Sequence, residues 1–475
     1  MTPLQTGVAR LRAFSESPAV PIALAAVFFI LQARHLPWAA MPGTDEGVYA
    51  QIGRLMVSGS VPHRDFAFYH MPLLPLLAGI GERITTITGV RMAFLFLNAF
   101  AVVPLYYAML SVRKDRFAAA VAVFFYLTYH EMVHHDFRFL AIRQLANDLL
   151  IAYVFLGTVG RGWKRSATLQ AACGCASGLL FLPAIVNVAF ASVSLAWMAP
   201  AARRKDEFVR YVAIGACALV PAILWLALVP NAFQQVVLDQ LHRSNESKLL
   251  RVEHLPDLSM DFRFYVVATA GLACGLFRRP LRPFAAGMLG VVSASLLLSS
   301  NFYPHYLSVA GPAFAYGIFC AAVLARESSR VLRRLATPVF LLLVGAFVAS
   351  HSSLVLPSLL SEWNGNKPDE YAEIVRSLRG GGKVLAMQPV YAVSARVDMV
   401  DELLPAYTRP PVGWRRFSQS EYEAMAATAC SILLDGSLRD ALPAGLAEQW
   451  LARYAKVVEN SWATVLRTSN PSCPA

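Results

Sequence analysis

The chain contains few charged residues for its length. Charged side chains make up 15% of its 475 residues, whereas soluble globular domains carry roughly 25%. Hydrophobic residues reach 56%, and the mean hydropathy is +0.48. Aromatic residues account for 11%, which excludes intrinsic disorder, because disordered chains are poor in aromatic and aliphatic side chains. The composition therefore excludes an ordinary soluble enzyme and indicates an integral membrane protein.

Cysteine is also scarce, with seven residues in the whole chain. Five of them lie in apolar segments, where cysteine usually serves as a small core residue. These five are Cys173, Cys175, Cys217, Cys274 and Cys320. Only Cys430 and Cys473 fall in a polar region, where a disulfide could form if that region is extracytoplasmic. The cysteines therefore predict no metal or redox framework.

Acidic residues are fewer than basic ones, and the formal net charge is +12. No basic stripe carries the interleaved aromatic residues that a nucleic-acid groove needs, so nucleic acid is not an expected partner. The basic residues instead form clusters between apolar runs, which is typical of cytoplasmic loops. Such clusters begin at Arg10, Arg113, Arg161, Arg203, Arg278 and Arg326. The N-terminus is expected in the cytoplasm, before a first helix that serves as an uncleaved anchor.

With these clusters on one side, the apolar runs predict about eleven membrane-spanning helices. They lie near residues 18–34, 91–110, 117–131, 139–159, 167–181, 183–199, 209–229, 262–278, 284–301, 306–325 and 335–356. Residues 167–199 are expected to form a hairpin that breaks near Pro183. The run Pro72–Thr88 is expected to lie in the outer interface, because a crossing there would invert every later basic cluster.

An odd number of crossings places the chain after residue 356 outside the cytoplasm. This polar region contains two β-like apolar runs, Lys383–Met387 and Ser431–Leu434, with helical patterns around them. We therefore predict an α-helical polytopic transmembrane domain over 1–356, with outer-loop and juxtamembrane helices at 35–90. A small extracytoplasmic α/β domain is predicted over 357–475. The basic charge and short loops look bacterial, so the outer side is expected to be a periplasm.

Polar residues gather in the predicted outer segments, where ionisable groups near a membrane are candidates for function. Asp45 and Glu46 open an amphipathic helix in the first outer loop, although an acidic first turn also suits the helix dipole. The other candidates in or beside these segments are Arg64, Asp65, His70, Glu131, His134, Asp136, Arg138, Arg143, His305 and Tyr306. Asp148 lies further along the predicted helix than Arg143 and would need a partner if it is buried.

Two of these segments together resemble the GT-C superfamily, the polytopic membrane glycosyltransferases that use lipid-linked phosphate donors. The likeness is to the branch of protein O-mannosyltransferases and aminoarabinose transferases. The first outer loop carries Asp-Glu-x-x-Tyr-Ala-x-Ile from Asp45, then Arg64-Asp65-Phe66 and His70-Met71-Pro72-Leu73-Leu74. A late His-Tyr motif is represented by Tyr303-Pro304-His305-Tyr306. Met71 departs from the family pattern, which has a proline there.

The resemblance implies that a sugar moves from a polyprenyl-phosphate donor to a hydroxyl group of a lipid, glycan or protein. The transfer is expected to invert the sugar stereochemistry at the outer face of the cytoplasmic membrane. The family's catalytic carboxylate corresponds to Asp45, which would act as the base. Glu46 would shape the pKa of Asp45 or ligate a metal, or it would be a solvated helix residue. Asp136 is a candidate second carboxylate of the active site.

Cationic and hydrogen-bonding residues are the candidates for holding the donor phosphate. They are Arg64, His70, Arg138, Arg143, His305 and Tyr306. Several also have a structural interpretation. Arg64 could pair with Asp65 to hold the loop, and the arginines at the start of a crossing helix could be snorkelling anchors.

The sequence also allows a divalent metal site and two other functions. Glu131, His134 and Asp136 could bind Mg²⁺ or Mn²⁺, although no cofactor is certain. The first alternative function is a transporter or flippase of a lipid-linked or soluble solute, which would favour ionisable residues near the bilayer midplane and inverted repeats. The second is a non-catalytic scaffold, for which Asp45 and Glu46 would be replaceable. The enzyme is favoured because the charges gather at one face and no repeat is visible.

Overall fold

The computed structural model describes residues 17–33, 45–66, 68–128, 140–162, 165–239, 262–298, 308–327, 368–400 and 417–473. By its internal contacts the chain divides into two compact units. Unit 1 comprises Met1–His35, Ala93–Trp225 and Glu246–Glu362. Unit 2 comprises Leu36–Met92, Leu226–Asn245 and Trp363–Ala475.

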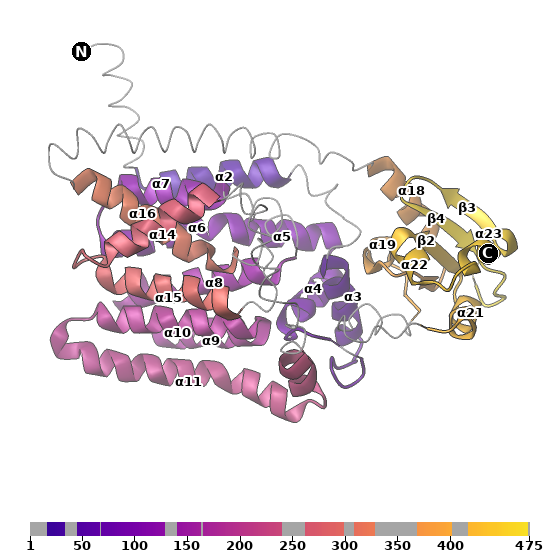
Figure 1. Cartoon of the computed structure of the whole chain (residues 1–475), viewed down its shortest axis with the longest axis horizontal. Helices are drawn as coiled ribbons and strands as arrows, with labels where there is room; N and C mark the ends of the chain where they lie inside the picture. Colours follow the sequence, from indigo (N-terminus) through magenta and orange to yellow (C-terminus); the bar gives the residue numbers. More distant parts are fainter. Residues whose placement is uncertain are drawn as a thin grey trace, which may run out of the picture. The chain divides into compact units, whose positions relative to one another are not determined.

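Unit 1 is a bundle of apolar helices that lie side by side (Figure 1). Its α-helices are α2 (Val20–Ala33), α6 (Val102–Val112), α7 (Arg116–Thr128), α8 (Ile142–Thr158), α9 (Ser166–Leu180), α10 (Leu182–Trp197), α11 (Arg204–Leu228), α14 (Phe262–Gly275), α15 (Arg282–Leu298) and α16 (Gly311–Glu327). Two short 3₁₀ helices are η3 (Val159–Gly162) and η4 (Ala201–Arg203). Helix α16 is the most enclosed, because α7, α14 and α15 all pack against it.

The helical character of the membrane part is confirmed. Helices occupy ten of the eleven predicted stretches, and the eleventh, 335–356, lies outside the described residues. Among the described segments, three are long and apolar enough to cross a membrane: Ile87–Val112, Ala201–Leu228 and Ser308–Glu327. Shorter apolar helices accompany them, so the exact number of crossings stays a prediction.

The predicted hairpin at 167–199 is present as α9 and α10, which pack against each other. Helix α9 ends at Leu180, and Phe181 has an extended backbone before α10 begins. Pro183 occupies the first turn of α10, where its missing N–H removes no hydrogen bond. The break therefore falls where the proline predicts it.

In unit 2, the outer-loop segment folds into two helices, α3 (Asp45–Val57) and α4 (Leu73–Ile84). Their backbones touch at Gly53 and Gly79, and a Cβ atom on either glycine would overlap the backbone of the other helix. Both helices were predicted, and the membrane depth of α4 stays a prediction. The π-helix η5 (Gln234–Leu238) belongs to the same unit. Helix α5 (Ile87–Phe100) has residues in both units, and the last three residues of α11 also belong to unit 2.

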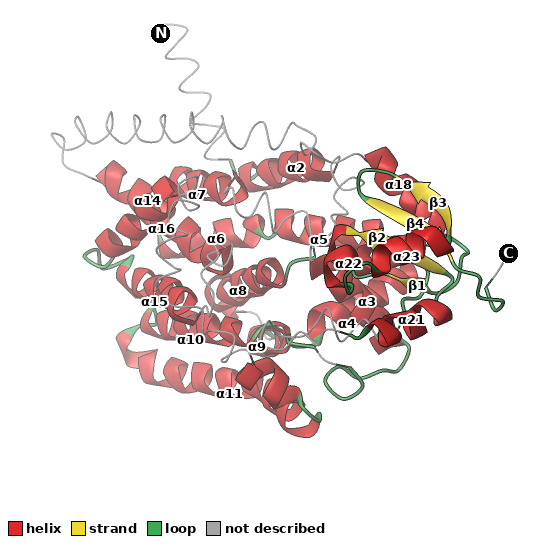
Figure 2. Cartoon of the chain, turned by 45° about the vertical axis from the view of Figure 1, so that its right-hand side comes forward, coloured by secondary structure: helices red, strands yellow, loops and turns green. Residues whose placement is uncertain are grey.

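The C-terminal part of unit 2 is an α/β structure with a four-stranded sheet (Figure 2). Its elements are α18 (Pro368–Leu378), β1 (Val384–Leu385), α19 (Pro389–Ala395), α21 (Gln419–Thr428), β2 (Ser431–Asp435), α22 (Gly436–Ala441), α23 (Leu446–Arg453), β3 (Ala455–Glu459) and β4 (Ala463–Arg467). The strand order is β1-β2-β4-β3, with β1 parallel to β2 and the other pairs antiparallel. The two apolar runs predicted as strands are β1 and β2.

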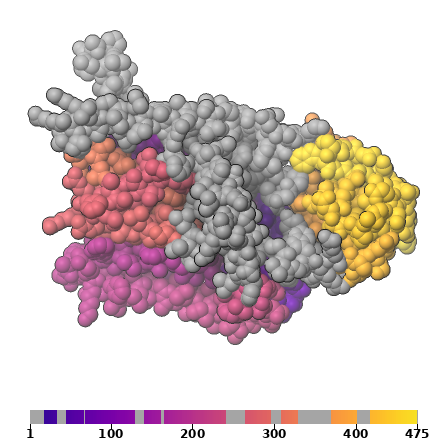
Figure 3. Space-filling view, viewed as in Figure 1, coloured from indigo at the N-terminus to yellow at the C-terminus, as the bar shows by residue number. Residues whose placement is uncertain are grey.

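Helices cover both faces of this sheet. Side chains alternate between the two faces along each strand, so a strand covered on both faces contributes to two cores. Leu385, Ile432 and Leu434 point into a core with α21, α22 and α23. Val384 and Leu433 point into a second core with α18 and α19. Strand β2 is therefore buried at all five positions, which explains why its three central residues, Ile432–Leu434, are all apolar. Residues 417–473 supply much of the yellow surface in the space-filling view (Figure 3).

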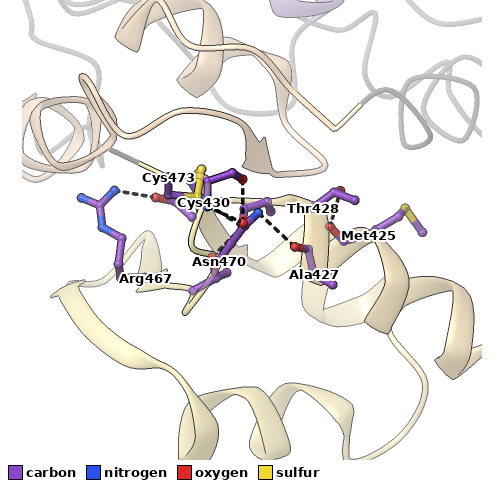
Figure 4. Close-up of a disulfide and its surroundings, with 11 residues drawn as sticks. Met425, Ala427, Thr428, Cys430, Arg467, Asn470 and Cys473 are labelled. Atoms are coloured by element: carbon purple, nitrogen blue, oxygen red, sulfur yellow. Dashed lines mark hydrogen bonds between the residues drawn. A yellow bond between two sulfur atoms is a disulfide. The ribbon is translucent and has the colours of Figure 1, made fainter. Parts of the chain in front are cut away.

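A disulfide joins Cys430, which directly precedes β2, to Cys473 after β4 (Figure 4). The two cysteines are 43 positions apart in sequence. Beside the bridge, the side-chain amide of Asn470 donates a hydrogen bond to the carbonyl oxygen of Ala427 at 3.0 Å. The bridge ties the end of the chain to the middle of the sheet.

Loss of this disulfide should destabilise the α/β part by about 2–4 kcal/mol, since it closes a long loop in the unfolded chain. We expect a reductant to lower the Tm of the wild-type protein and to leave the Cys430→Ser/Cys473→Ser variant unchanged. Differential scanning fluorimetry in detergent would measure this. Equal melting of the wild type with and without reductant would contradict the bridge.

Asp435 ends β2 and caps the following helix from a buried position. Its Oδ1 accepts a hydrogen bond from the backbone N–H of Leu438 at 2.8 Å, while Oδ2 has no hydrogen-bond partner among the described residues. Burial raises the pKa of Asp435 to about 6. An unfolded aspartate titrates near pH 4, so the folded state binds the proton more tightly. Stability is therefore lost as the pH rises from about 4 to about 6.

The substitution Asp435→Asn should remove this pH dependence and keep the cap, since asparagine is an equally good N-cap residue. At pH 7.5 we expect the variant to be more stable than the wild type by up to about 3 kcal/mol, the equivalent of two pKa units. Melting curves at pH 4 and pH 7.5 would measure the difference. A variant that is less stable than the wild type at pH 7.5 would contradict the account.

Candidate functional site

Helix α3 presents one exposed carboxylate and buries nearly everything that follows it. Asp45 is its first residue and is exposed, whereas each residue from Glu46 to Gly53 is buried. An acidic side chain in the first turn is stabilised by the helix dipole. Of the two neighbouring acids, only Asp45 is therefore open to a substrate.

Glu46 forms a buried ion pair with Arg91 of α5. The side chains of Glu46 and Arg91 are 0% and 2% exposed, and both carboxylate oxygens accept hydrogen bonds from the guanidinium group. A bidentate pair of this kind fixes orientation as well as charge. Glu46 is therefore not the solvated helix residue that the sequence allowed.

Arg91 is not among the site residues predicted from the sequence, although the sequence carries a signal for it. It lies at the edge of the apolar run predicted to cross near 91–110. An arginine within such a run needs a charged or polar partner, and the sequence offers several acids without indicating which one is near. Only the packing of α3 and α5 identifies Glu46.

The loop between α3 and α4 is held by the predicted pair of Arg64 and Asp65. Arg64 Nε lies 2.8 Å from Asp65 Oδ1 and Arg64 Nη2 lies 2.8 Å from Asp65 Oδ2. Asp65 Oδ2 also accepts a hydrogen bond from the backbone N–H of Val61 at 2.7 Å. The hydrogen bonds from Arg64 and from Val61 lower the pKa of Asp65 to about 2. The local pair is confirmed, and phosphate binding by Arg64 stays a prediction.

His63, in the same loop, is buried in a left-handed backbone conformation with φ of 71°. Its Nδ1 lies 3.1 Å from Oε1 of Gln235 in the π-helix η5, and the same oxygen accepts from the backbone N–H of Phe68 at 3.0 Å. Burial lowers the pKa of His63. Gln235 thus connects the loop to a segment about 170 residues later, and π-helices are frequent at functional sites.

His70 lies against an aromatic pair from α3 and the loop. Its ring centroid is 6.0 Å from that of Tyr49 and 5.7 Å from that of Phe68, both edge-on. Tyr49 and Phe68 are buried, whereas His70 is partly exposed. The aromatic rings therefore orient an imidazole on the same unit as Asp45.

In unit 1, polar side chains of α8 are hydrogen-bonded inside the bundle. The amide nitrogen of Asn98, with the amide oriented to donate, lies 2.7 Å from Asp148 Oδ2, and Gln144 Nε2 donates to Asp148 Oδ1 at 3.1 Å. These amides are the hydrogen-bond partners that Asp148, a partly buried carboxylate in an apolar bundle, requires. Arg143, in the first turn of α8, is partly buried.

Two asparagines hold the backbone that follows the His305-Tyr306 motif. Asn147 of α8 donates to the carbonyl oxygen of Ser308 at 2.7 Å, and Asn187 of α10 donates to that of Val309 at 3.4 Å. The sequence assigns neither amide a role, because asparagine in an apolar helix signals only that some acceptor must be near.

Several predicted site residues fall outside the described residues. They are Glu131, His134, Asp136, Arg138, His305 and Tyr306. Within the described ranges no group of three or more histidine, cysteine, aspartate or glutamate residues could hold a metal ion. Glu46 is a poor metal ligand, because both of its oxygens face Arg91.

No protein-family model and no curated protein matches the sequence. Solved structures do match it. ArnT from Cupriavidus metallidurans bound to undecaprenyl phosphate aligns with a TM-score of 0.62 and 15% identity over 94% of this chain and 97% of that chain. The apo state of the same enzyme gives a TM-score of 0.55 over the same shares.

A further likeness is to the oligosaccharyltransferase of Archaeoglobus fulgidus, crystallised with zinc and sulfate. The TM-score is 0.53 and the identity 13%, over 94% of this chain and 73% of that chain. These likenesses extend over nearly the whole chain. They show that the chain has the GT-C fold, as its sequence motifs predicted.

The buried pair of Glu46 and Arg91 makes a prediction about stability. Arg91→Met should destabilise the protein by about 3–5 kcal/mol, because it leaves Glu46 as an uncompensated buried charge. The double variant Glu46→Leu/Arg91→Met should recover much of that loss, since apolar replacements of a whole buried pair are often nearly neutral. Melting temperatures of the three proteins in detergent would measure this. Equal Tm values for Arg91→Met and the wild type would contradict a buried ion pair.

Proposed function

We propose that the protein is a membrane glycosyltransferase that takes a sugar from a polyprenyl-phosphate donor. The observation that carries the proposal is the fold it shares, over 94% of its length, with ArnT bound to undecaprenyl phosphate. The exposed carboxylate of Asp45 at the start of α3 supports the same activity. The apolar helices agree with a substrate that is itself embedded in the membrane.

The proposed reaction is a displacement at C1 of the sugar. The acceptor hydroxyl attacks C1 while a general base removes its proton. The bond between C1 and the phosphate oxygen breaks, and its electron pair leaves on the phosphate. Attack from the side opposite the phosphate inverts the configuration at C1. A base for the hydroxyl and cationic groups for the departing phosphate are what this chemistry requires.

Asp45 is the proposed base, and the geometry favours it over its neighbour. Asp45 is exposed at the start of α3, whereas Glu46 is enclosed and paired with Arg91. Glu46 would therefore serve the reaction by holding the first turn of α3 in place. Asp136 is the proposed second carboxylate of the site.

The proposed contacts of the donor phosphate are cationic or hydrogen-bonding side chains. They are Arg64, His70, Arg138, Arg143, His305 and Tyr306. Of these, His70 has the clearest local support, because the rings of Tyr49 and Phe68 orient it. The hydrogen bonds of Asn147 and Asn187 to the backbone at Ser308 and Val309 would steady the chain just after His305 and Tyr306.

The remaining parts of the proposal concern the setting of the reaction. The active site would face the outer side of a bacterial cytoplasmic membrane, with the N-terminus in the cytoplasm. The acceptor would be a hydroxyl group of a lipid, glycan or protein. A transmembrane domain over 1–356 and a periplasmic α/β domain over 357–475 complete this arrangement. The disulfide in the latter agrees with an oxidising compartment.

Replacing the proposed base should abolish the chemistry and spare the fold. We expect Asp45→Asn to lower transfer by about 10²- to 10⁴-fold, the usual contribution of a general base. Transfer of label from a panel of radiolabelled polyprenyl-phosphate sugars to membrane extract would measure it, with purified wild-type and variant protein.

Asp440→Asn is the matched control, because Asp440 is an exposed acid in the α/β part; it should transfer at the wild-type rate. Full transfer by Asp45→Asn would show that another group is the base, and Asp136 would be the first candidate. If the wild-type protein neither binds nor turns over any donor, the proposed glycosyltransferase activity is wrong.

A further inference from the structure

Helix α19 of the α/β part packs directly along α3, the helix that begins at Asp45. The two backbones come very close at Gly47. A Cβ atom on Gly47 would lie 2.5 Å from the backbone nitrogen of Val390 and 2.8 Å from its Cα. Real Cβ atoms do not approach backbone this closely, so any larger residue at position 47 would separate the helices.

Arg54 makes the second connection between these helices, two turns further along α3. Seven residues correspond to about 700° of helical rotation, so Arg54 shares a face with Gly47. Its Nη2 donates to the carbonyl oxygen of Val393 at 2.7 Å, and Nη1 donates to that of Val397 at 3.4 Å. Val393 lies in the last turn of α19, and Val397 follows the C-cap residue of that helix. A basic side chain is favoured there.

The same guanidinium group binds Glu82 near the end of α4. Arg54 Nε lies 2.8 Å from Glu82 Oε2, and Nη2 lies 3.4 Å from Oε1. The Glu82 side chain is 8% exposed and that of Arg54 22%, so water competes little for the pair. Arg54 therefore joins α3, α4 and α19 through one planar group. Lysine could not reproduce this, because its ammonium is a point charge without the rigid fork.

A neighbouring contact strengthens the junction. Arg396, at the C-cap of α19, donates from Nη2 to the carbonyl oxygen of Thr85, which directly follows α4. The end of α19 is thus bound to both outer-loop helices.

Arg54 and Asp45 lie on opposite sides of α3. Nine residues correspond to about 900° of rotation, or half a turn beyond two full turns. Arg54 contacts α19, so it does not share the face of Asp45. Any effect of Arg54 on the reaction must pass through the position of α3.

We propose that Arg54 is a positioning residue: by binding Glu82 and the end of α19, it fixes α3, and with it Asp45, against the C-terminal α/β part. The α/β part thereby serves as the support of the catalytic helix. This inference rests on the proposed function, because it takes Asp45 as the base. A displacement of about 1 Å at a reacting group can cost about 100-fold in rate, so a modest loosening of α3 is enough to matter.

The test combines kinetics with amide hydrogen exchange on the full-length protein. Arg54→Gln should lower kcat for sugar transfer by about 10- to 100-fold with the KM for the donor unchanged. The amides of α3 should exchange faster. Arg54→Lys should recover part of the rate, and Glu82→Gln, which keeps an acceptor but loses the charge, should show a smaller loss. Arg453→Gln is the matched control, since Arg453 pairs with Glu423 on the surface of the α/β part; it should change neither readout.

The Gly47→Ala variant tests the same junction without touching a charge. It should speed exchange in α3 and lower kcat, while Gly215→Ala, where an added Cβ meets nothing within 4 Å, should have no effect. Unchanged exchange in Arg54→Gln, or faster exchange with kcat retained, would overturn the proposal. If the wild type turns over no donor, the proposed function is wrong instead. In that case the amide hydrogen exchange of α3 in Arg54→Gln would still show whether Arg54 holds α3 against α19.

Discussion

A carboxylate that leaves the solvent needs an opposite charge at contact distance, and the pair of Glu46 and Arg91 meets this requirement at the start of α3. Both side chains are almost fully enclosed, so separating them would leave an uncompensated charge. The pair therefore fixes the first turn of α3 against α5. Asp45, one residue earlier, is left exposed in a defined place. The candidate active site depends on this arrangement more than on any single residue that could touch a substrate.

The polar groups of the described residues fall into two kinds. Some buried groups have a specific partner, as Asp148 has in Asn98 and Gln144, and as the carbonyl of Ser308 has in Asn147. Such groups are structural, because hydrogen bonds inside an apolar bundle fix the positions of its helices. Asp45 differs in being exposed next to a buried helix. The exposure of Asp45, and not the number of charges nearby, distinguishes this candidate catalytic residue from the residues that hold the helices together.

The C-terminal α/β part belongs to the same compact unit as α3 and α4. Its sheet is covered on both faces, and a disulfide secures the end of the chain to it. Its composition predicts a separate soluble domain after residue 356. Its contacts with α3 through α19 are the basis of the support that we propose for the helix that begins at Asp45, because a reacting group needs a rigid support.

The sequence alone determined the helical membrane part, the two apolar strands, the helix that opens at Asp45 and the pair of cysteines in the polar tail. These features follow from periodicity, apolar length and breaker residues, which act over a few neighbouring positions. The tertiary structure decided the partners: Arg91 for Glu46, 45 positions away; Gln235 for His63, 172 away; and Val393 for Arg54, 339 away. Local patterns show that a charge needs a partner, but only packing brings one particular partner within reach.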